Sequence, residues 1–276
     1  MNKTIFITGA SSGIGKATAK FFQSKGWNVV ATMRSPEKEK ELTSLDNILV
    51  AKLDVLDLES IDLAIQKAIE TFSKIDVLLN NAGYGINGPL EAFPHENIVK
   101  HFHTNVIGLL DVTKAVIPHF RQNKSGTIIN ISSTAGKVTY PFISLYNGSK
   151  FAVEGISESL SFEMAAISVK VKIIEPGQID TDFMGRSMDV QNKEDLKPYQ
   201  KALEKQKELS KQTFDPEKIS SPTMVAEVIY EAATDNSDQL RYQAGADAIK
   251  EIANRANTND QTYLRERKKA LGLEEE

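Results

Sequence analysis

The strongest constraint on the fold is a repeated alternation between short β-rich runs and longer segments of helical period. The runs are apolar with few polar interruptions, as is typical of strands buried on both faces of a parallel sheet. This order of βαβ units predicts an α/β fold, a doubly wound parallel sheet of about seven strands flanked by helices on both faces. The expected strands are Thr4–Thr8, Asn28–Met33, Ile48–Leu53, Val77–Asn80, Thr127–Ser132, Lys170–Glu175 and a weaker Gln239–Gln243. The expected helices are Gly15–Lys25, Pro36–Leu45, Leu58–Phe72, Glu96–Gln122 and Ser144–Ile167.

The length of 276 residues suits one α/β domain with a substantial core. We expect this domain to span residues 1–248, followed by a charged helical tail at 249–276. A polar stretch rich in lysine and glutamine, Met184–Lys211, follows the last strong strand. It predicts a mobile lid over a substrate pocket at about 182–215, and a surface helical excursion is the alternative.

Several classes of function are disfavoured by the composition. The absence of cysteine excludes disulfides and thiolate chemistry, and the net charge of −4 gives no reason to expect a nucleic acid or an anionic membrane as partner. The chain enters a strand pattern at Thr4 without a long apolar stretch, so we predict a cytoplasmic protein. We interpret the four histidines, at positions 95, 101, 103 and 119, as ordinary surface or capping residues and expect no metal site.

A glycine-rich turn, Thr8 to Gly15, joins the first strand to the first helix with the spacing G-x-x-x-G-x-G. Glycines allow a tight turn and close approach of the backbone to a pyrophosphate, and the amino end of a helix attracts negative charge. A simple tight connection is the alternative. The position of this turn within the first βαβ unit favours a dinucleotide site.

Polar residues follow the next three strands. Arg34 follows the second strand, where an acidic residue would favour NAD and an arginine favours the 2′-phosphate of NADP. The alternative is that Arg34 only solvates the start of the next helix. Asp54 follows the third strand and is a candidate partner for the adenine amino group, although Asp54 or Asp57 is equally a candidate helix cap. Asn81 follows the fourth and is placed to order the loop that carries the cofactor.

Tyr146 and Lys150 have the i, i+4 spacing that puts two side chains on one face of a helix, and Ser133 lies thirteen residues before the tyrosine. A free phenol, with a pKa of about 10, is a poor acid/base at neutral pH. A lysine beside it is expected to lower that pKa toward the working range. Taken alone, this short and common pattern favours an ordinary pair on a helix surface.

Together these motifs resemble the classical short-chain dehydrogenase/reductase family, in its branch of steroid and retinol dehydrogenases. The resemblance is carried by the glycine turn, Asn80 to Gly83, Asn105, Ser133, Tyr146 with Lys150, and Pro176 to Thr181. It implies a single-domain Rossmann-type fold, a small-molecule alcohol or ketone substrate, and a homodimer or homotetramer.

The resemblance also implies roles for individual residues. Tyr146 would be the acid/base, Lys150 would lower its pKa and bind the nicotinamide ribose, Ser133 would orient the substrate oxygen, and Asn105 would anchor a water. Ser132, the adjacent hydroxyl, is expected to point the other way. The residues expected to bind the cofactor are Gly9, Ser11, Ser12, Gly13, Ile14, Gly15, Arg34, Asp54, Val55, Asn81, Ala82, Gly83, Tyr146, Lys150, Pro176, Gly177, Ile179 and Thr181. Ser12 stands where many NADP-using members carry a basic residue, so the NADP prediction depends on Arg34.

The predicted function is an NADP-dependent oxidoreductase that transfers a hydride between the nicotinamide and a secondary alcohol or ketone. The substrate would be a steroid, a retinoid or another hydrophobic carbonyl compound. A catalytically inactive NAD(P)-sensing regulator of the same fold is the main alternative. An epimerase or dehydratase of the extended branch is a third, disfavoured by the chain length and glycine spacing.

Overall fold

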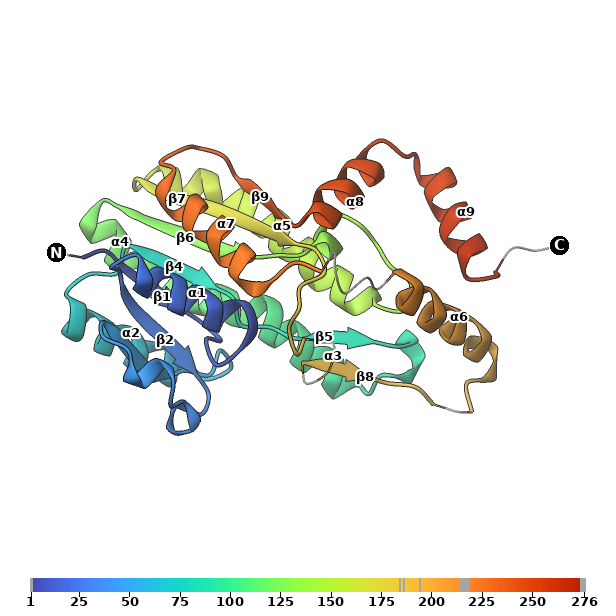
Figure 1. Cartoon of the computed structure of the whole chain (residues 1–276), viewed down its shortest axis with the longest axis horizontal. Helices are drawn as coiled ribbons and strands as arrows, with labels where there is room; N and C mark the ends of the chain where they lie inside the picture. Colours follow the sequence, from blue (N-terminus) through green and yellow to red (C-terminus); the bar gives the residue numbers. More distant parts are fainter. Residues whose placement is uncertain (1, 184, 186, 194, 214–218, 274–276) are drawn as a thin grey trace.

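The computed structural model describes residues 2–183, 185, 187–193, 195–213 and 219–273, and its main feature is a seven-stranded parallel sheet (Figure 1). The strands are β1 (Thr4–Ile7), β2 (Asn28–Met33), β3 (Ile48–Lys52), β4 (Val77–Asn80), β6 (Gly126–Ile131), β7 (Val169–Pro176) and β9 (Arg241–Ala244). Their order is β3-β2-β1-β4-β6-β7-β9, and all neighbours are parallel. The chain therefore winds in both directions from β1, which confirms the doubly wound α/β fold.

Two layers of helices cover the sheet because alternate strand residues face opposite ways. Ile5 and Ile7 of β1 belong to one buried cluster, and Phe6 between them belongs to the other. The helices are α1 (Gly13–Ser24) and α7 (Pro222–Thr234) on the first face, and α2 (Leu58–Phe72), α4 (Gly108–Asn123) and α5 (Ser144–Ala165) on the second. The helix α7 is not among those expected from the sequence. None of the described helices has the length and apolar character needed to cross a membrane.

The helix expected at Glu96–Gln122 is divided into three parts. They are α3 (His95–Phe102), a π-helical turn at His103–Ile107, and α4. A π-turn widens the helix locally, and such turns are frequent at functional sites. Asn105 lies at the centre of this one.

The helix expected at Pro36–Leu45 is wrong. The segment forms two short 3₁₀ turns, Pro36–Lys38 and Leu42–Ser44. Between them, one carboxylate oxygen of Glu39 accepts hydrogen bonds from the backbone N–H groups of Glu41 and Leu42, at 2.9 and 3.0 Å. A side chain that bonds nearby backbone groups in this way competes with a continuous helix.

A small second sheet lies at the end of the molecule opposite the N-terminus (Figure 1). It pairs β5 (Gly85–Asn87) with β8 (Met188–Val190), and α6 (Lys197–Thr213) follows. Asn97 of α3 donates to a carboxylate oxygen of Asp189 at 2.7 Å, which ties β8 to the body. These elements occupy the expected lid at 182–215, of which residues 184, 186, 194, 214 and 215 lie outside the described part. The lid function itself stays a prediction.

The C-terminal region contains two helices, α8 (Ala246–Ala256) and α9 (Asp260–Ala270). The expected boundary between residues 248 and 249 falls inside α8. Tyr263 of α9 is buried against Val138 and Ile252, and its hydroxyl donates to the Thr139 carbonyl. This part of the predicted tail is therefore packed on the domain, and the final glutamates at 274–276 lie outside the described residues.

Candidate active site

The glycine turn after β1 depends on glycines for its backbone conformation and for its close packing. Gly9 and Gly13 have φ values of 70° and 54°, which favour glycine. A Cβ on Gly15 would lie 2.4 Å from the Gly9 carbonyl oxygen and 2.5 Å from the Asn81 side-chain nitrogen. Ser12, the N-cap of α1, makes no side-chain capping hydrogen bond. The first-turn amides thus face a turn with little side-chain bulk, which fits a pyrophosphate.

Asn81 fastens this turn to the end of β4. Its side-chain amide donates to the carbonyl oxygens of Thr8 at 2.9 Å and Gly9 at 3.0 Å. The backbone N–H groups of Asn81 and Ala82 donate to the Thr8 hydroxyl. These long-range hydrogen bonds join two strand ends and fix the backbone on which the expected pyrophosphate would rest.

The residues after β2 and β3 lie at the same edge of the sheet. The Asp54 carboxylate accepts from the backbone N–H of Leu56 at 3.1 Å, whereas Asp57 is the N-cap of α2. Val55 lies against α4, because a Cβ on Gly108 would come within 2.7 Å of the Val55 Cβ. Arg34 is exposed and forms no hydrogen bond or ion pair with the described part of the chain.

The segment Pro176 to Thr181 leads from β7 toward the glycine turn. Asp247 of α8 accepts a hydrogen bond from the backbone N–H of Gln178 at 2.6 Å. A Cβ on Gly177 would lie 2.2 Å from that carboxylate, so the close approach requires glycine. At the other end, Thr181 lies beside Gly13, whose added Cβ would be 3.4 Å from the threonine methyl. The loop therefore spans from the end of β7 to the amino end of α1.

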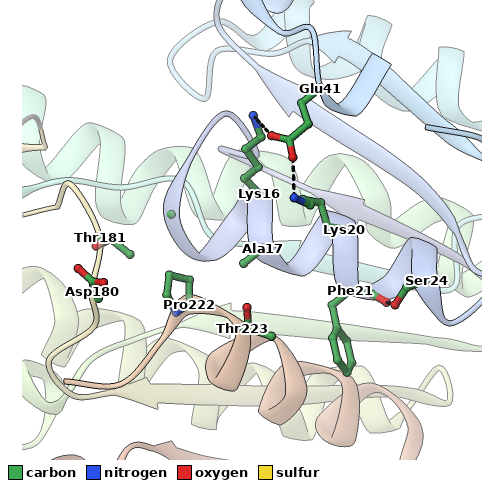
Figure 2. Close-up of a pocket in the computed structure, with 11 residues that line it drawn as sticks. Lys16, Ala17, Lys20, Phe21, Ser24, Glu41, Asp180, Thr181, Pro222 and Thr223 are labelled. Atoms are coloured by element: carbon green, nitrogen blue, oxygen red, sulfur yellow. Dashed lines mark hydrogen bonds and ion pairs between the residues drawn. The ribbon is translucent and has the colours of Figure 1, made fainter. Parts of the chain in front are cut away.

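A cavity of about 510 Å³ lies on the outer side of this loop, between α1 and the start of α7 (Figure 2). Gly13 and Thr181 line it, together with Lys16 and Lys20, which form ion pairs with Glu41 at 3.0 and 2.5 Å. None of Ser133, Tyr146 and Lys150 lines it. The cavity therefore adjoins the glycine turn and is separate from the expected catalytic side chains.

The helix α5 carries Tyr146 and Lys150 in its first two turns, beside the carboxyl end of β6. The Lys150 Nζ lies 5.7 Å from the centre of the Tyr146 ring and donates to the Ile131 carbonyl oxygen at 2.9 Å. Ser133 follows β6, and its side chain lies close enough to the Tyr146 phenol to lower the pKa of that phenol. The hydroxyl of the neighbouring Ser132 lies beside Gly136 instead, 2.6 Å from the position of a Cβ added to that glycine. Three of the four expected catalytic side chains are thus brought together.

The pKa values of the pair differ from the sequence expectation. Burial raises the pKa of Tyr146 to about 12, although the nearby Ser133 side chain opposes this. Burial lowers the pKa of Lys150 to about 8, and the charge of Glu154 opposes it. The expected lowering of the phenol pKa by the lysine is not seen, because the ammonium is directed to Ile131 and desolvation dominates both groups.

Asn105, the fourth expected residue, organises the neighbouring loop. Its side-chain oxygen accepts from the Tyr84 backbone N–H at 3.0 Å, and its nitrogen donates to the Tyr84 carbonyl at 2.9 Å. That nitrogen also lies 3.4 Å from the Ser149 hydroxyl, in the turn that carries Lys150. The π-turn thereby connects the segment after β4 to α5. The water-anchoring role stays a prediction.

His101 is a residue that the sequence interpretation missed. It is fully buried, not a surface residue, and its Nε2 lies 3.2 Å from the Ser149 hydroxyl. Its ring centre is 5.0 Å from that of Tyr84 and 6.3 Å from that of Tyr146. Burial and the charge of Lys150 lower the pKa of His101 to about 4. A neutral histidine therefore supports α5, the helix that carries Tyr146 and Lys150, and the spacing of His101 in the sequence gave no signal of this.

Comparison with known proteins identifies the family. The model of the short chain dehydrogenase family matches residues 3–192. The chain belongs to the short-chain dehydrogenase family. An uncharacterized oxidoreductase of Schizosaccharomyces pombe is 46% identical over 246 residues, which cover 87% of this chain and all of the relative. This short-chain dehydrogenase is accordingly an oxidoreductase that acts on alcohol or carbonyl groups.

Solved structures agree with this assignment. A short-chain dehydrogenase from Streptomyces avermitilis is 30% identical, with a TM-score of 0.84 over 97% of this chain and 96% of that one. ElxO, solved with NADP bound, is also 30% identical, with a TM-score of 0.72 over 88% of this chain and 98% of its own. A nicotinamide cofactor is supported by the NADP bound to ElxO, and the glycine turn of this short-chain dehydrogenase fits one.

Proposed function

We propose that this short-chain dehydrogenase is an NADP-dependent oxidoreductase that interconverts a secondary alcohol and a ketone. The supporting observation is the convergence of Ser133, Tyr146 and Lys150 beside the loop that follows β7. When bound, the cofactor supplies or accepts the hydride. The residues of the chain then bind and orient the substrate oxygen and move its proton.

Tyr146 carries the proton in this proposal. With its pKa raised to about 12, the phenol is protonated at neutral pH and can donate to a ketone oxygen as that oxygen gains charge. Ser133, whose side chain lies close to the phenol, is placed to bind the same oxygen and to stabilise its charge. In this proposal the Lys150 ammonium, which bonds the Ile131 carbonyl in the free protein, turns to the phenolate that remains and stabilises it.

The preference for NADP is supported by Arg34, because the lysines near the glycine turn are already paired with glutamates. Lys16 is paired with Glu39 and Glu41, and Lys20 with Glu41. Arg34 is the basic side chain after β2, at the adenine end of the expected site, and it has no such partner among the described residues. A guanidinium without an acidic partner is suited to binding a 2′-phosphate.

We expect Arg34→Asp to lower the ratio of kcat/KM for NADPH to that for NADH by about 10- to 100-fold. The variant removes a charge-assisted hydrogen bond and adds a repulsive carboxylate. Steady-state kinetics with both cofactors measure the ratio. Arg265→Asp, the same charge change at an exposed residue of α9, serves as the control. An unchanged ratio in Arg34→Asp would show that another residue selects the cofactor.

The hydrophobic substrate class rests on the aromatic rings around Tyr146. The Phe183 ring centre lies 5.9 Å from it, and the edge of the small second sheet adds Met188, whose sulfur is 2.8 Å from an added Gly85 Cβ. These surroundings favour an apolar carbonyl compound such as a steroid or a retinoid. The assignment to the steroid and retinol branch, a homodimer or homotetramer, and a cytoplasmic location stay predictions.

A catalytically inactive NAD(P) sensor is the competing function. Incubation with NADPH and a panel of ketones, followed at 340 nm, separates the two. Turnover of at least one ketone supports the oxidoreductase, whereas NADPH binding without turnover of any panel member supports the sensor. We expect turnover, because a sensor has no use for an acid/base tyrosine beside a lysine and a serine.

A further inference from the structure

A group of buried charged side chains lies directly behind Lys150, between α5 and the last two strands of the main sheet. Glu154 is 4% exposed and Glu175 is fully buried. Arg241 of β9 donates through its Nε to Glu154 at 2.9 Å and lies 3.6 Å from an oxygen of Glu175. One oxygen of Glu154 and both oxygens of Glu175 have no hydrogen-bond partner within the described chain. We call Glu154 and Glu175 the carboxyl pair.

The charges in this group do not balance if every carboxyl is ionised. Arg241 is shared by Glu154, Glu175 and the exposed Glu158, whose oxygen it binds at 2.5 Å. Buried charges without hydrogen bonds are costly, so one carboxyl of the pair is expected to keep its proton. Burial and the charge of Glu154 raise the pKa of Glu175 to about 7, although the charges of Lys137 and Arg241 oppose this. Glu175 is therefore the member that holds the proton.

The carboxyl pair also contacts the structures on both sides of the expected reaction site. Glu154 follows Lys150 by one helical turn, and its charge raises the pKa of that lysine. A Cβ on Gly136 would lie 2.9 Å from the Glu154 Cγ and 3.1 Å from the Lys150 carbonyl oxygen, so this region is closely packed. Glu175 directly precedes Pro176, where the expected nicotinamide loop begins.

We propose that the carboxyl pair holds one proton at neutral pH, and that the single negative charge it retains behind Lys150 keeps the lysine cationic in the working range. Glu154 and Glu175 are then positioning residues that act through Lys150, an inference that rests on the role proposed above for that lysine. The other titratable groups near Lys150 and the pair are Tyr146 and Glu158 on α5, His101 on α3, Arg241 on β9 and Lys137. Of these, His101 is neutral at pH 7 because burial lowers its pKa.

The effect of the carboxyl pair on the pKa of Lys150 is tested on the protein without substrate. The measurement is an NMR titration of lysine side chains labelled with ¹³C at Cε. The Lys150 resonance is assigned by its absence in Lys150→Met. We expect Glu154→Gln to lower the Lys150 midpoint by about one pH unit, because a buried charge one turn away is removed. Glu158→Gln, which removes an exposed partner of the same arginine, should leave the midpoint in place. Equal midpoints in wild type and Glu154→Gln would overturn the proposal.

The shared proton is tested first on the wild-type protein, and the two glutamine variants then assign the resonance. With glutamate labelled at the side-chain carboxyl carbon, we expect one wild-type resonance to titrate near pH 7 and to be absent in Glu175→Gln. That midpoint should fall in Glu154→Gln, since the neighbouring charge raises it. If every glutamate titrates below pH 6, the pair holds no proton and the proposal is wrong.

A functional readout separates this inference from the proposed function. The alkaline limb of kcat/KM for ketone reduction should move to lower pH in Glu154→Gln by the same amount as the Lys150 midpoint. If the NMR midpoint moves and the limb does not, the role assigned to Lys150 in catalysis is wrong, although the carboxyl pair still sets its charge. If neither moves, the carboxyl pair does not act on Lys150.

Discussion

Tyr146→Phe should lower kcat for ketone reduction by about 100- to 10,000-fold, the range expected when a general acid is removed. The substitution removes only the phenol hydroxyl, which lies close to Ser133, and keeps the ring that packs near His101 and Phe183. The affinity for NADPH should change by less than about threefold, because the glycine turn is untouched. Steady-state rates at 340 nm and a fluorescence titration of NADPH provide the two measurements.

The matched control is Tyr230→Phe, which removes the hydroxyl of a different tyrosine, one on the opposite face of the sheet. Tyr230 packs against Phe21, Phe22 and Trp27 in the cluster between α1 and α7. Its substitution should leave kcat within about twofold of wild type. If Tyr146→Phe retained more than a tenth of wild-type kcat, the proton would have to come from another group and the proposed mechanism would be wrong.

Gly15→Ala should abolish measurable cofactor binding and lower the free energy of unfolding by about 1–3 kcal/mol. The new methyl group would stand 2.4 Å from the Gly9 carbonyl oxygen and 2.5 Å from the Asn81 side-chain nitrogen, so the turn must open. Loss of the Asn81 hydrogen bonds would then release the backbone that is expected to hold the pyrophosphate. Denaturant unfolding and NADPH titration measure the two effects.

Gly155→Ala gives the control for this change. Gly155 lies in the exposed middle of α5, and nothing is within 4 Å of where its Cβ would stand. Alanine there should raise the free energy of unfolding by up to about 1 kcal/mol, because it reduces the entropy of the unfolded helix segment. Wild-type affinity for NADPH in Gly15→Ala would contradict the placement of the cofactor on this turn.

The fold was predictable because each central strand is one continuous apolar run in the sequence. The runs that became β1, β2 and β4 are continuous in the sequence and bounded by turn residues, so their order sufficed for the doubly wound sheet. The segment Pro36–Leu45 has helical spacing, yet Glu39 binds backbone groups and divides it. The strands β5 and β8 are three residues each and are separated by about one hundred residues, so their pairing leaves no local pattern.

The site was predictable where residue type and spacing carry the chemistry, as for Tyr146 with Lys150 and for the glycine turn. The site was not predictable where the burial of a side chain determines its role or its pKa. His101 has no distinctive spacing, and only the fold shows that it is enclosed beside Ser149. The direction of the Tyr146 pKa shift was likewise wrong, because the sequence reveals a neighbouring lysine and not the loss of water around the phenol.

Transfer of a labelled hydride tests the central claim most directly. The wild-type protein is incubated with the ketone panel and NADPH that carries deuterium at both C4 positions, and the products are analysed by mass spectrometry. The proposed oxidoreductase predicts an alcohol with one deuterium on the former carbonyl carbon, formed in equal amount to the NADP released. NADPH that binds to the protein while no panel member gains deuterium would contradict the account and favour the sensor.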